Sequence, residues 1–183
     1  MKVTPSPGHR YMKKGLAVIL IDMQDFFLNN FSSATRNYLI NEQSKILDLC
    51  VNENIPLVVF EYKAGGVNRG KTTPKLEKKI RKISQEIIIK ENNSAFTKTH
   101  LDKILKGLKV KRILLMGINA NGCVQDTAIA AIHRGYKVIT SSELMASASV
   151  GKLGLSKRNI KWYAENTDLF ENERELMSYL KND

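Results

Sequence analysis

Hydrophobic residues in this chain occur in short, nearly continuous runs. Runs of this length that are rich in β-branched residues predict strands, and continuous runs predict strands that are buried on both faces. Such strands are typical of a parallel sheet that is covered by helices on each side. The predicted strands span residues 16–22, 57–62, 86–90, 112–117 and 137–140.

Between these runs, apolar residues are spaced as on one face of a helix. Alternating strands and helices predict an α/β doubly wound fold. A short last strand is expected within residues 163–170. The predicted helices span residues 40–51, 74–83, 99–107, 121–134 and, at the end of the chain, 171–181; in the first of them Ile46, Leu47, Leu49, Cys50 and Val51 should face the core.

The length of 183 residues and the hydrophobic content of 43% fit one domain, which we expect over residues 15–183. Residues 1–14 contain Pro5, Pro7 and Gly8 and are expected to be poorly ordered. The apolar run after Lys14 ends at Asp22, so it is too short to span a membrane and lacks a signal-peptide cleavage site.

The formal net charge is +11, and many of the basic residues crowd into one segment, residues 63–82. No aromatic residues interleave this segment as a nucleic-acid stacking surface would need, so we expect a solvated face and no nucleic-acid or membrane partner. The two cysteines, Cys50 and Cys123, lie on different predicted elements, which favours a reducing, cytoplasmic location.

Cys123 lies where a predicted strand passes through a small-residue turn into a predicted helix, with Asn121 as the candidate N-cap. Backbone N–H groups and the helix dipole stabilise an anion in the first turn, and they can lower a thiol pKa below its usual value of about 8.5. The position therefore predicts a reactive thiolate, whereas Cys50 is expected to be a packing residue.

Polar residues follow the other predicted strands. Asp22 ends the first strand, Glu61 and Tyr62 end the second, and Lys90 ends the third. Because the carboxyl ends of parallel strands share one edge of a sheet, a carboxylate, an ammonium group and the Cys123 thiol are expected to meet there.

Three fragments resemble the isochorismatase-like cysteine hydrolases, a superfamily that includes nicotinamidases, carbamoylsarcosine amidases and ureidoacrylate amidases. The fragments are residues 18–24 with Phe27, residues 89–90 followed by 94–96 and Leu101, and residues 117–124 with Thr127 and Ala128. The resemblance covers about residues 15–145. It implies a three-layer α-β-α fold, hydrolysis of a small amide or ureide C–N bond through a thioester, and a homo-oligomer, either a dimer or a tetramer.

The resemblance also implies a catalytic triad of Asp22, Lys90 and Cys123. It further implies a cis peptide between Ile118 and Asn119, and an oxyanion hole formed by the N–H groups of Asn119 and Cys123. Phe27 and Tyr62 are candidate pocket residues; for Phe27, a role in the core is equally open.

Several residues depart from the patterns of particular family members. Metal-containing nicotinamidases carry an Asp and two His after the second strand, whereas this chain has Glu61-Tyr62-Lys63 there. Because borderline metals favour nitrogen or sulfur ligands, we expect no metal and no other cofactor. His100 and His133 fall outside the motifs and are expected at the surface. Isochorismatases that cleave a vinyl ether lack the nucleophilic cysteine, so Cys123 favours amide hydrolysis.

Two alternatives remain open from the sequence. Residues 65–72 match the G-x-x-x-x-G-K-[ST] pattern of a phosphate-binding loop between a strand and a helix, which would indicate a nucleotide-binding protein. The following helix has only a thin apolar stripe, which favours a solvated loop instead. The other alternative is a non-catalytic binding protein on the same fold.

Overall fold

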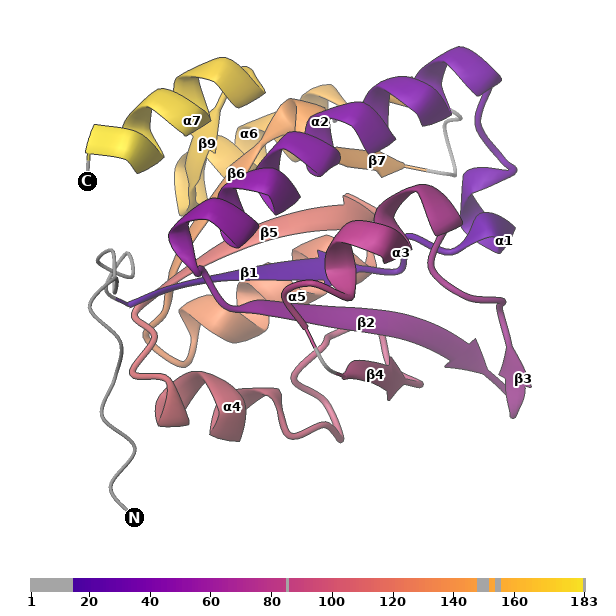
Figure 1. Cartoon of the computed structure of the whole chain (residues 1–183), viewed down its shortest axis with the longest axis horizontal. Helices are drawn as coiled ribbons and strands as arrows, with labels where there is room; N and C mark the ends of the chain where they lie inside the picture. The colour runs from indigo at the N-terminus through magenta and orange to yellow at the C-terminus, as the bar shows by residue number, and fades with distance from the viewer. Residues whose placement is uncertain (1–14, 85, 148–151, 154–155, 183) are drawn as a thin grey trace.

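The structure, a computed structural model, describes residues 15–84, 86–147, 152–153 and 156–182. Within these residues nine strands form one mixed, mainly parallel sheet (Figure 1). The strands are β1 (Leu16–Ile21), β2 (Leu57–Ala64), β3 (Val67–Asn68), β4 (Ile87–Lys90), β5 (Arg112–Ile118), β6 (Lys137–Ser141), β7 (Met145–Ser147), β8 (Lys152–Leu153) and β9 (Asp168–Phe170). The order across the sheet is β3-β2-β1-β5-β6-β9, with β4 paired to β2 and β7 paired to β5 and β8.

Helices cover both faces of the sheet, which makes three layers. Buried side chains of α2, α3 and α7 form one hydrophobic cluster against the sheet, and those of α4, α5 and α6 form a second cluster on the opposite face (Figure 1). The helices are α1 (Asp25–Leu28), α2 (Ser33–Glu53), α3 (Pro74–Ile80), α4 (Leu101–Gly107), α5 (Cys123–Ile132), α6 (Lys157–Asn166) and α7 (Glu173–Asn182), and Ser142–Leu144 form a 3-10 turn, η1.

Strand β1 explains why the apolar runs are continuous. Leu16, Val18 and Leu20 belong to the cluster with α2, whereas Ala17, Ile19 and Ile21 belong to the cluster with α5. Each apolar side chain gains free energy by leaving water, so a strand with a helical layer on both faces has no position that favours a polar residue. The prediction of an α/β fold with a parallel, doubly covered sheet is confirmed.

Some sequence predictions need correction at the helices. Helix α2 begins at Ser33, seven residues before the prediction, and the Ser32 side chain accepts a hydrogen bond from Thr35 N at 3.1 Å. Val51, expected to face the core, is 37% exposed because it lies about 140° around the helix from Ile46. Helix α6 was not predicted, whereas the short strand expected within residues 163–170 is present as Asp168–Phe170. Residues 1–14, predicted to be poorly ordered, lie outside the described residues.

The phosphate-loop alternative conflicts with the structure of residues 65–72. Strands β2 and β3 form an antiparallel hairpin, in which Ala64 pairs with Val67. Gly65 and Gly66 form the two-residue turn, and their φ values of +56° and +79° are those that glycine adopts readily. A phosphate-binding loop would instead run from the strand directly into a helix, with its N–H groups around the anion.

Candidate active site

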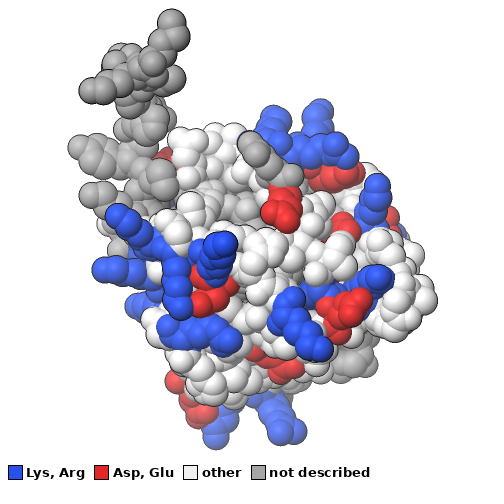
Figure 2. Space-filling view, turned by 90° about the horizontal axis from the view of Figure 1, so that it is seen from below, with Lys and Arg blue, Asp and Glu red and all other residues white. Residues whose placement is uncertain are grey.

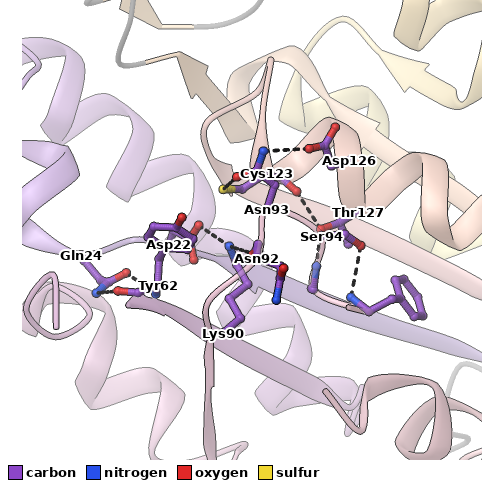
Figure 3. A network of polar contacts seen from close by, with 12 residues as sticks. Asp22, Gln24, Tyr62, Lys90, Asn92, Asn93, Ser94, Cys123, Asp126 and Thr127 are labelled. Atoms are coloured by element: carbon purple, nitrogen blue, oxygen red, sulfur yellow. Dashed lines mark hydrogen bonds and ion pairs between the residues drawn. The ribbon is translucent and has the colours of Figure 1, made fainter. Parts of the chain in front are cut away.

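A buried ion pair joins the ends of β1 and β4. Lys90 Nζ donates to Asp22 Oδ2 at 2.7 Å, and the two side chains are 0% and 1% exposed (Figure 3). Lys90 Nζ also donates to the carbonyl oxygen of Asn92 at 3.3 Å. Asp22 follows β1 with a φ of +54°, and its N–H donates to Phe60 O at 3.0 Å. The sheet order therefore brings together a carboxylate and an ammonium group that are 68 positions apart.

Cys123 is the first residue of α5, which follows β5, and β5 pairs with β1 on the side opposite β2. The peptide bond between Ile118 and Asn119 is cis. Asn119 O accepts hydrogen bonds from the N–H groups of Gly122 and Val124, at 3.0 and 3.1 Å, which shapes the turn into the helix. The prediction that Asn121 is the N-cap is wrong. Gly122 occupies that position, and Asn121 Oδ1 instead accepts from Ser147 Oγ at 3.0 Å.

Gly117 allows the ends of β1 and β5 to approach each other closely. Its φ is +140°, and a Cβ atom built there would lie 2.1 Å from the carbonyl oxygen of Ile21. Any side chain at this position would push the two strands apart. The close approach places Asp22, which follows Ile21, beside the turn that carries Cys123.

The electrostatics differ from the sequence-based expectation of a stabilised thiolate. Burial and the negative charge of Asp22 raise the pKa of the Cys123 thiol to about 11, and Lys90 only partly opposes them. Burial likewise raises the pKa of Asp22, although Lys90 acts in the opposite direction. The prediction of a lowered thiol pKa is wrong, because the helix N-terminus lies inside the protein next to a carboxylate, and loss of water disfavours the anion.

One carboxylate oxygen is left for the thiol. Asp22 Oδ1 is buried, and no hydrogen-bond partner is present for it among the described residues. The Cys123 thiol lies close enough to Asp22 and Lys90 for both to affect its pKa. The arrangement can therefore accept a proton from the thiol at Oδ1 while Lys90 holds Oδ2.

Hydrogen bonds hold the loop after the β2–β3 hairpin, which contains Gly70 and Thr72, beside the site. Gln24, which is fully buried, accepts from Tyr62 N at 2.6 Å and donates to Gly70 O at 2.7 Å. Glu61 Oε1 accepts from both the backbone N–H and the hydroxyl of Thr72, at 2.6 and 2.9 Å. Glu61 thus has a structural partner, and no group of three or more His, Cys, Asp or Glu side chains among the described residues could hold a metal ion.

The two candidate pocket aromatics have different surroundings. The Tyr62 ring centroid lies 4.6 Å from Lys90 Nζ, within the range of a cation–π contact. The Phe27 ring lies 6.2 Å from the Tyr62 ring and packs against the hydrophobic cluster that includes α2. Tyr62 therefore contacts Lys90 directly, whereas Phe27 is half-buried and packs against both the Tyr62 ring and the hydrophobic cluster.

Three further residues surround the thiol that the sequence analysis did not assign to the site. Asn93 Nδ2 donates to Asp126 Oδ2 at 3.0 Å, and Cys123 Sγ lies 4.0 Å from Asn93 Oδ1 (Figure 3). Thr127 Oγ1 accepts from Ala95 N at 2.9 Å and donates to Cys123 O at 2.7 Å. The available signal was weak: Asn93 is a polar residue shortly after a strand end, and Asp126 lies one helical turn after Cys123.

The remaining polar surface shows no single-sign patch on the face seen in Figure 2. Lys and Arg side chains lie there in several groups next to Asp and Glu side chains. Ion pairs such as Lys79–Asp48, at 2.6 Å, neutralise part of the positive charge of the basic segment, residues 63–82. His100 and His133 are both exposed, as predicted. Among the described residues, no helix has the length and apolar character that crossing a membrane requires.

Comparisons with known proteins agree with this fold. Residues 16–166 match the isochorismatase domain family, and the chain belongs to that family. It is 28% identical to nicotinamidase 3 of Arabidopsis thaliana over 151 residues, which are 72% of this chain and 73% of the relative.

Two solved structures show the same fold at lower identity. One is N-carbamoylsarcosine amidase from Thermoplasma acidophilum, with a TM-score of 0.68, 17% identity, and coverage of 84% of this chain and 93% of the other. The other is the MAR1 ribonuclease from Caenorhabditis elegans, with a TM-score of 0.74, 20% identity, and coverage of 95% and 85%. The protein is an isochorismatase-family hydrolase. One of the two solved structures is named an amidase and the other a ribonuclease, so the shared fold does not determine the substrate.

Proposed function

We propose that this protein is a cysteine-dependent hydrolase that cleaves the C–N bond of a small amide or ureide through a thioester intermediate. The observation that carries the proposal is the buried pair of Lys90 and Asp22, 2.7 Å apart, beside the Cys123 thiol at the start of α5. The similarity to a nicotinamidase supports an amide as the substrate class.

The first step forms the covalent intermediate. Asp22 Oδ1 takes the thiol proton, and the Cys123 sulfur attacks the acyl carbon. The N–H groups of Asn119 and Cys123 hold the developing oxyanion, and each such donor contributes roughly 2.7 to 4 kcal/mol. Asp22, now protonated, donates its proton to the departing nitrogen as the C–N bond breaks. The amine leaves, and the acyl group remains on the sulfur as a thioester.

Hydrolysis of the thioester completes the cycle. Asp22 accepts a proton from a water molecule, which attacks the thioester carbon in the same oxyanion hole. The C–S bond breaks, the thiolate is reprotonated, and the acid is released. Lys90 stays positively charged throughout, so it holds the Asp22 carboxylate in position and offsets the negative charge that passes between Asp22 and the sulfur.

The raised thiol pKa is compatible with this chemistry. With a pKa of about 11, the thiol keeps its proton at neutral pH until a substrate is present. A carboxylate whose own pKa is raised is a stronger base than a solvated one, so proton transfer within the pair is less unfavourable. A thiol that keeps its proton oxidises less readily than a thiolate, so the resting site is protected from oxidation.

Other parts of the proposal follow from the family and the cysteines. We expect a homo-oligomer, no cofactor and a cytoplasmic location, where two free, buried thiols would remain reduced. Light scattering of the full chain would test the oligomeric state.

A panel of small amides and ureides, assayed for release of ammonia, tests the proposed activity. We expect Cys123→Ala to abolish turnover and Cys50→Ala, the matched change at the other buried cysteine, to retain it. Mass spectrometry of wild type quenched during turnover should find the acyl group on Cys123. Full turnover by Cys123→Ala would refute the thiol mechanism.

A further inference from the structure

Asn93 lies beside the Cys123 thiol (Figure 3) and also lines a polar groove on the surface. The groove has a volume of about 640 Å³, and its lining includes Tyr62, Asn93, Ser94 and Asp126. Cys123 lies beyond this lining, 4.0 Å from Asn93 Oδ1. Asn93 thus both lines the groove and lies next to the sulfur.

Asp126 determines which end of the Asn93 amide faces the sulfur. A carboxylate can only accept hydrogen bonds, so the Asn93 nitrogen must face Asp126 Oδ2, 3.0 Å away, and the oxygen must face Cys123. Asp126 and Cys123 are three residues apart on α5 and lie on the same side of the helix. The site consequently presents a hydrogen-bond acceptor beside the sulfur.

The segment that carries Asn93 is also held against α5. Ala95 N donates to Thr127 Oγ1, which in turn donates to Cys123 O, at 2.9 and 2.7 Å. At the other end of the segment, Lys90 Nζ donates to Asn92 O at 3.3 Å. Contacts on both sides of Asn93 thus keep its oxygen at a defined distance from the sulfur.

We propose that Asn93 determines specificity by accepting a hydrogen bond from an N–H group bonded to the carbonyl carbon that Cys123 attacks. An attack distance of about 3 to 3.5 Å from sulfur to the carbonyl carbon, a C–N bond of about 1.3 Å and an N–H···O length of about 2.9 Å close a four-sided path with the 4.0 Å from sulfur to oxygen. Primary amides and ureides carry such an N–H. Esters and N,N-disubstituted amides lack it. The inference rests on the proposed function for the reaction but concerns recognition only.

Alkylation of Cys123 tests this recognition without turnover. Iodoacetamide carries amide N–H donors on the carbon next to the one that the sulfur attacks, one bond farther than in the proposed substrate, whereas methyl iodoacetate carries none. The ratio of their second-order rate constants is measured at Cys123 by mass spectrometry, then divided by the same ratio for N-acetylcysteine in solution. We expect a normalised ratio of about 10 in wild type, as one hydrogen bond would give, and a ratio near 1 in Asn93→Leu and Asn93→Ala. Circular dichroism verifies that both variants are folded.

Asn52→Leu is the matched control, because Asn52 is exposed on α2 and this variant should keep the wild-type ratio. A normalised ratio near 1 in wild type, or an unchanged ratio in both Asn93 variants, would overturn the inference. A preserved preference with no hydrolysis of any amide would refute the proposed function alone. Amide hydrolysis without the preference would refute only the role of Asn93.

Discussion

Lys90 and Asp22 form an ion pair at 2.7 Å that is almost completely shielded from solvent. Taking two charges out of water is costly, and their mutual attraction repays that cost only while both are present. A fold that needed stability alone could fill this space with apolar side chains. The pair therefore indicates a site that is maintained for its chemistry, and it makes the consequences of single substitutions unusually clear.

Replacing Lys90 by Met should destabilise the protein by about 3 to 5 kcal/mol, because Asp22 would remain buried without its cation. The double variant Asp22→Asn, Lys90→Met should recover part of this loss, since neither charge would remain. Urea denaturation of the wild type, both single variants and the double variant gives the coupling energy. Additive losses in the double variant would show that the pair is not coupled.

Asp22→Asn should change catalysis and thiol reactivity in opposite directions. Loss of the base should lower kcat by about 10²- to 10⁴-fold. The carboxylate also raises the pKa of Cys123, so its removal lowers that pKa and increases the thiolate fraction. Alkylation of Cys123 at pH 8 should therefore become faster than in wild type. Slower alkylation in Asp22→Asn would contradict the electrostatic prediction, and it would show that Asp22 assists the thiol as a base more than its charge disfavours the thiolate.

Gly117→Ala should disrupt the site by separating β1 from β5. The added Cβ would lie 2.1 Å from Ile21 O. We expect the free energy of unfolding to fall by about 1 to 3 kcal/mol or more. Turnover should fall as well, because Asp22 would be displaced from Cys123. Gly107→Ala is the control, since nothing lies within 4 Å of its Cβ position. Thermal unfolding and amidase assays of both variants provide the comparison. Wild-type behaviour of Gly117→Ala would show that the strands tolerate separation.

The pH profile should respond to Glu61, which lies beside Asp22. Asp22 must be ionised to act as a base, so activity should fall as the pH drops through the raised pKa of Asp22. The charge of Glu61 is one cause of that raised pKa. Glu61→Gln can still accept from Thr72, and it should move the acid limb of kcat/KM to lower pH. Glu165→Gln on the distant α6 should leave the limb in place; an identical profile for Glu61→Gln would show that the charge of Glu61 does not set the acid limb.

Local sequence was sufficient for the elements that depend on burial. All five predicted strands are present. The reason is clearest in β1, where burial on both faces requires an uninterrupted apolar run. The local sequence did not predict α6, whose sequence is mostly polar, or the residue at which α2 begins. Those boundaries depend on capping and on contacts with distant segments, such as the hydrogen bond from Tyr163 Oη to Ala120 O at 2.8 Å.

The amino-acid sequence by itself determined the alternation of strands and helices. Because the carboxyl ends of parallel strands share one edge of a sheet, it also determined the edge at which Asp22, Lys90 and Cys123 lie. Only the tertiary structure decided the direction in which the pKa of the thiol is shifted and the orientation of Asn93. Both depend on burial and on the charges of residues far away in the chain. A periodic pattern reports which side of an element is apolar, but electrostatic energies depend on distances between groups that only the folded chain brings together.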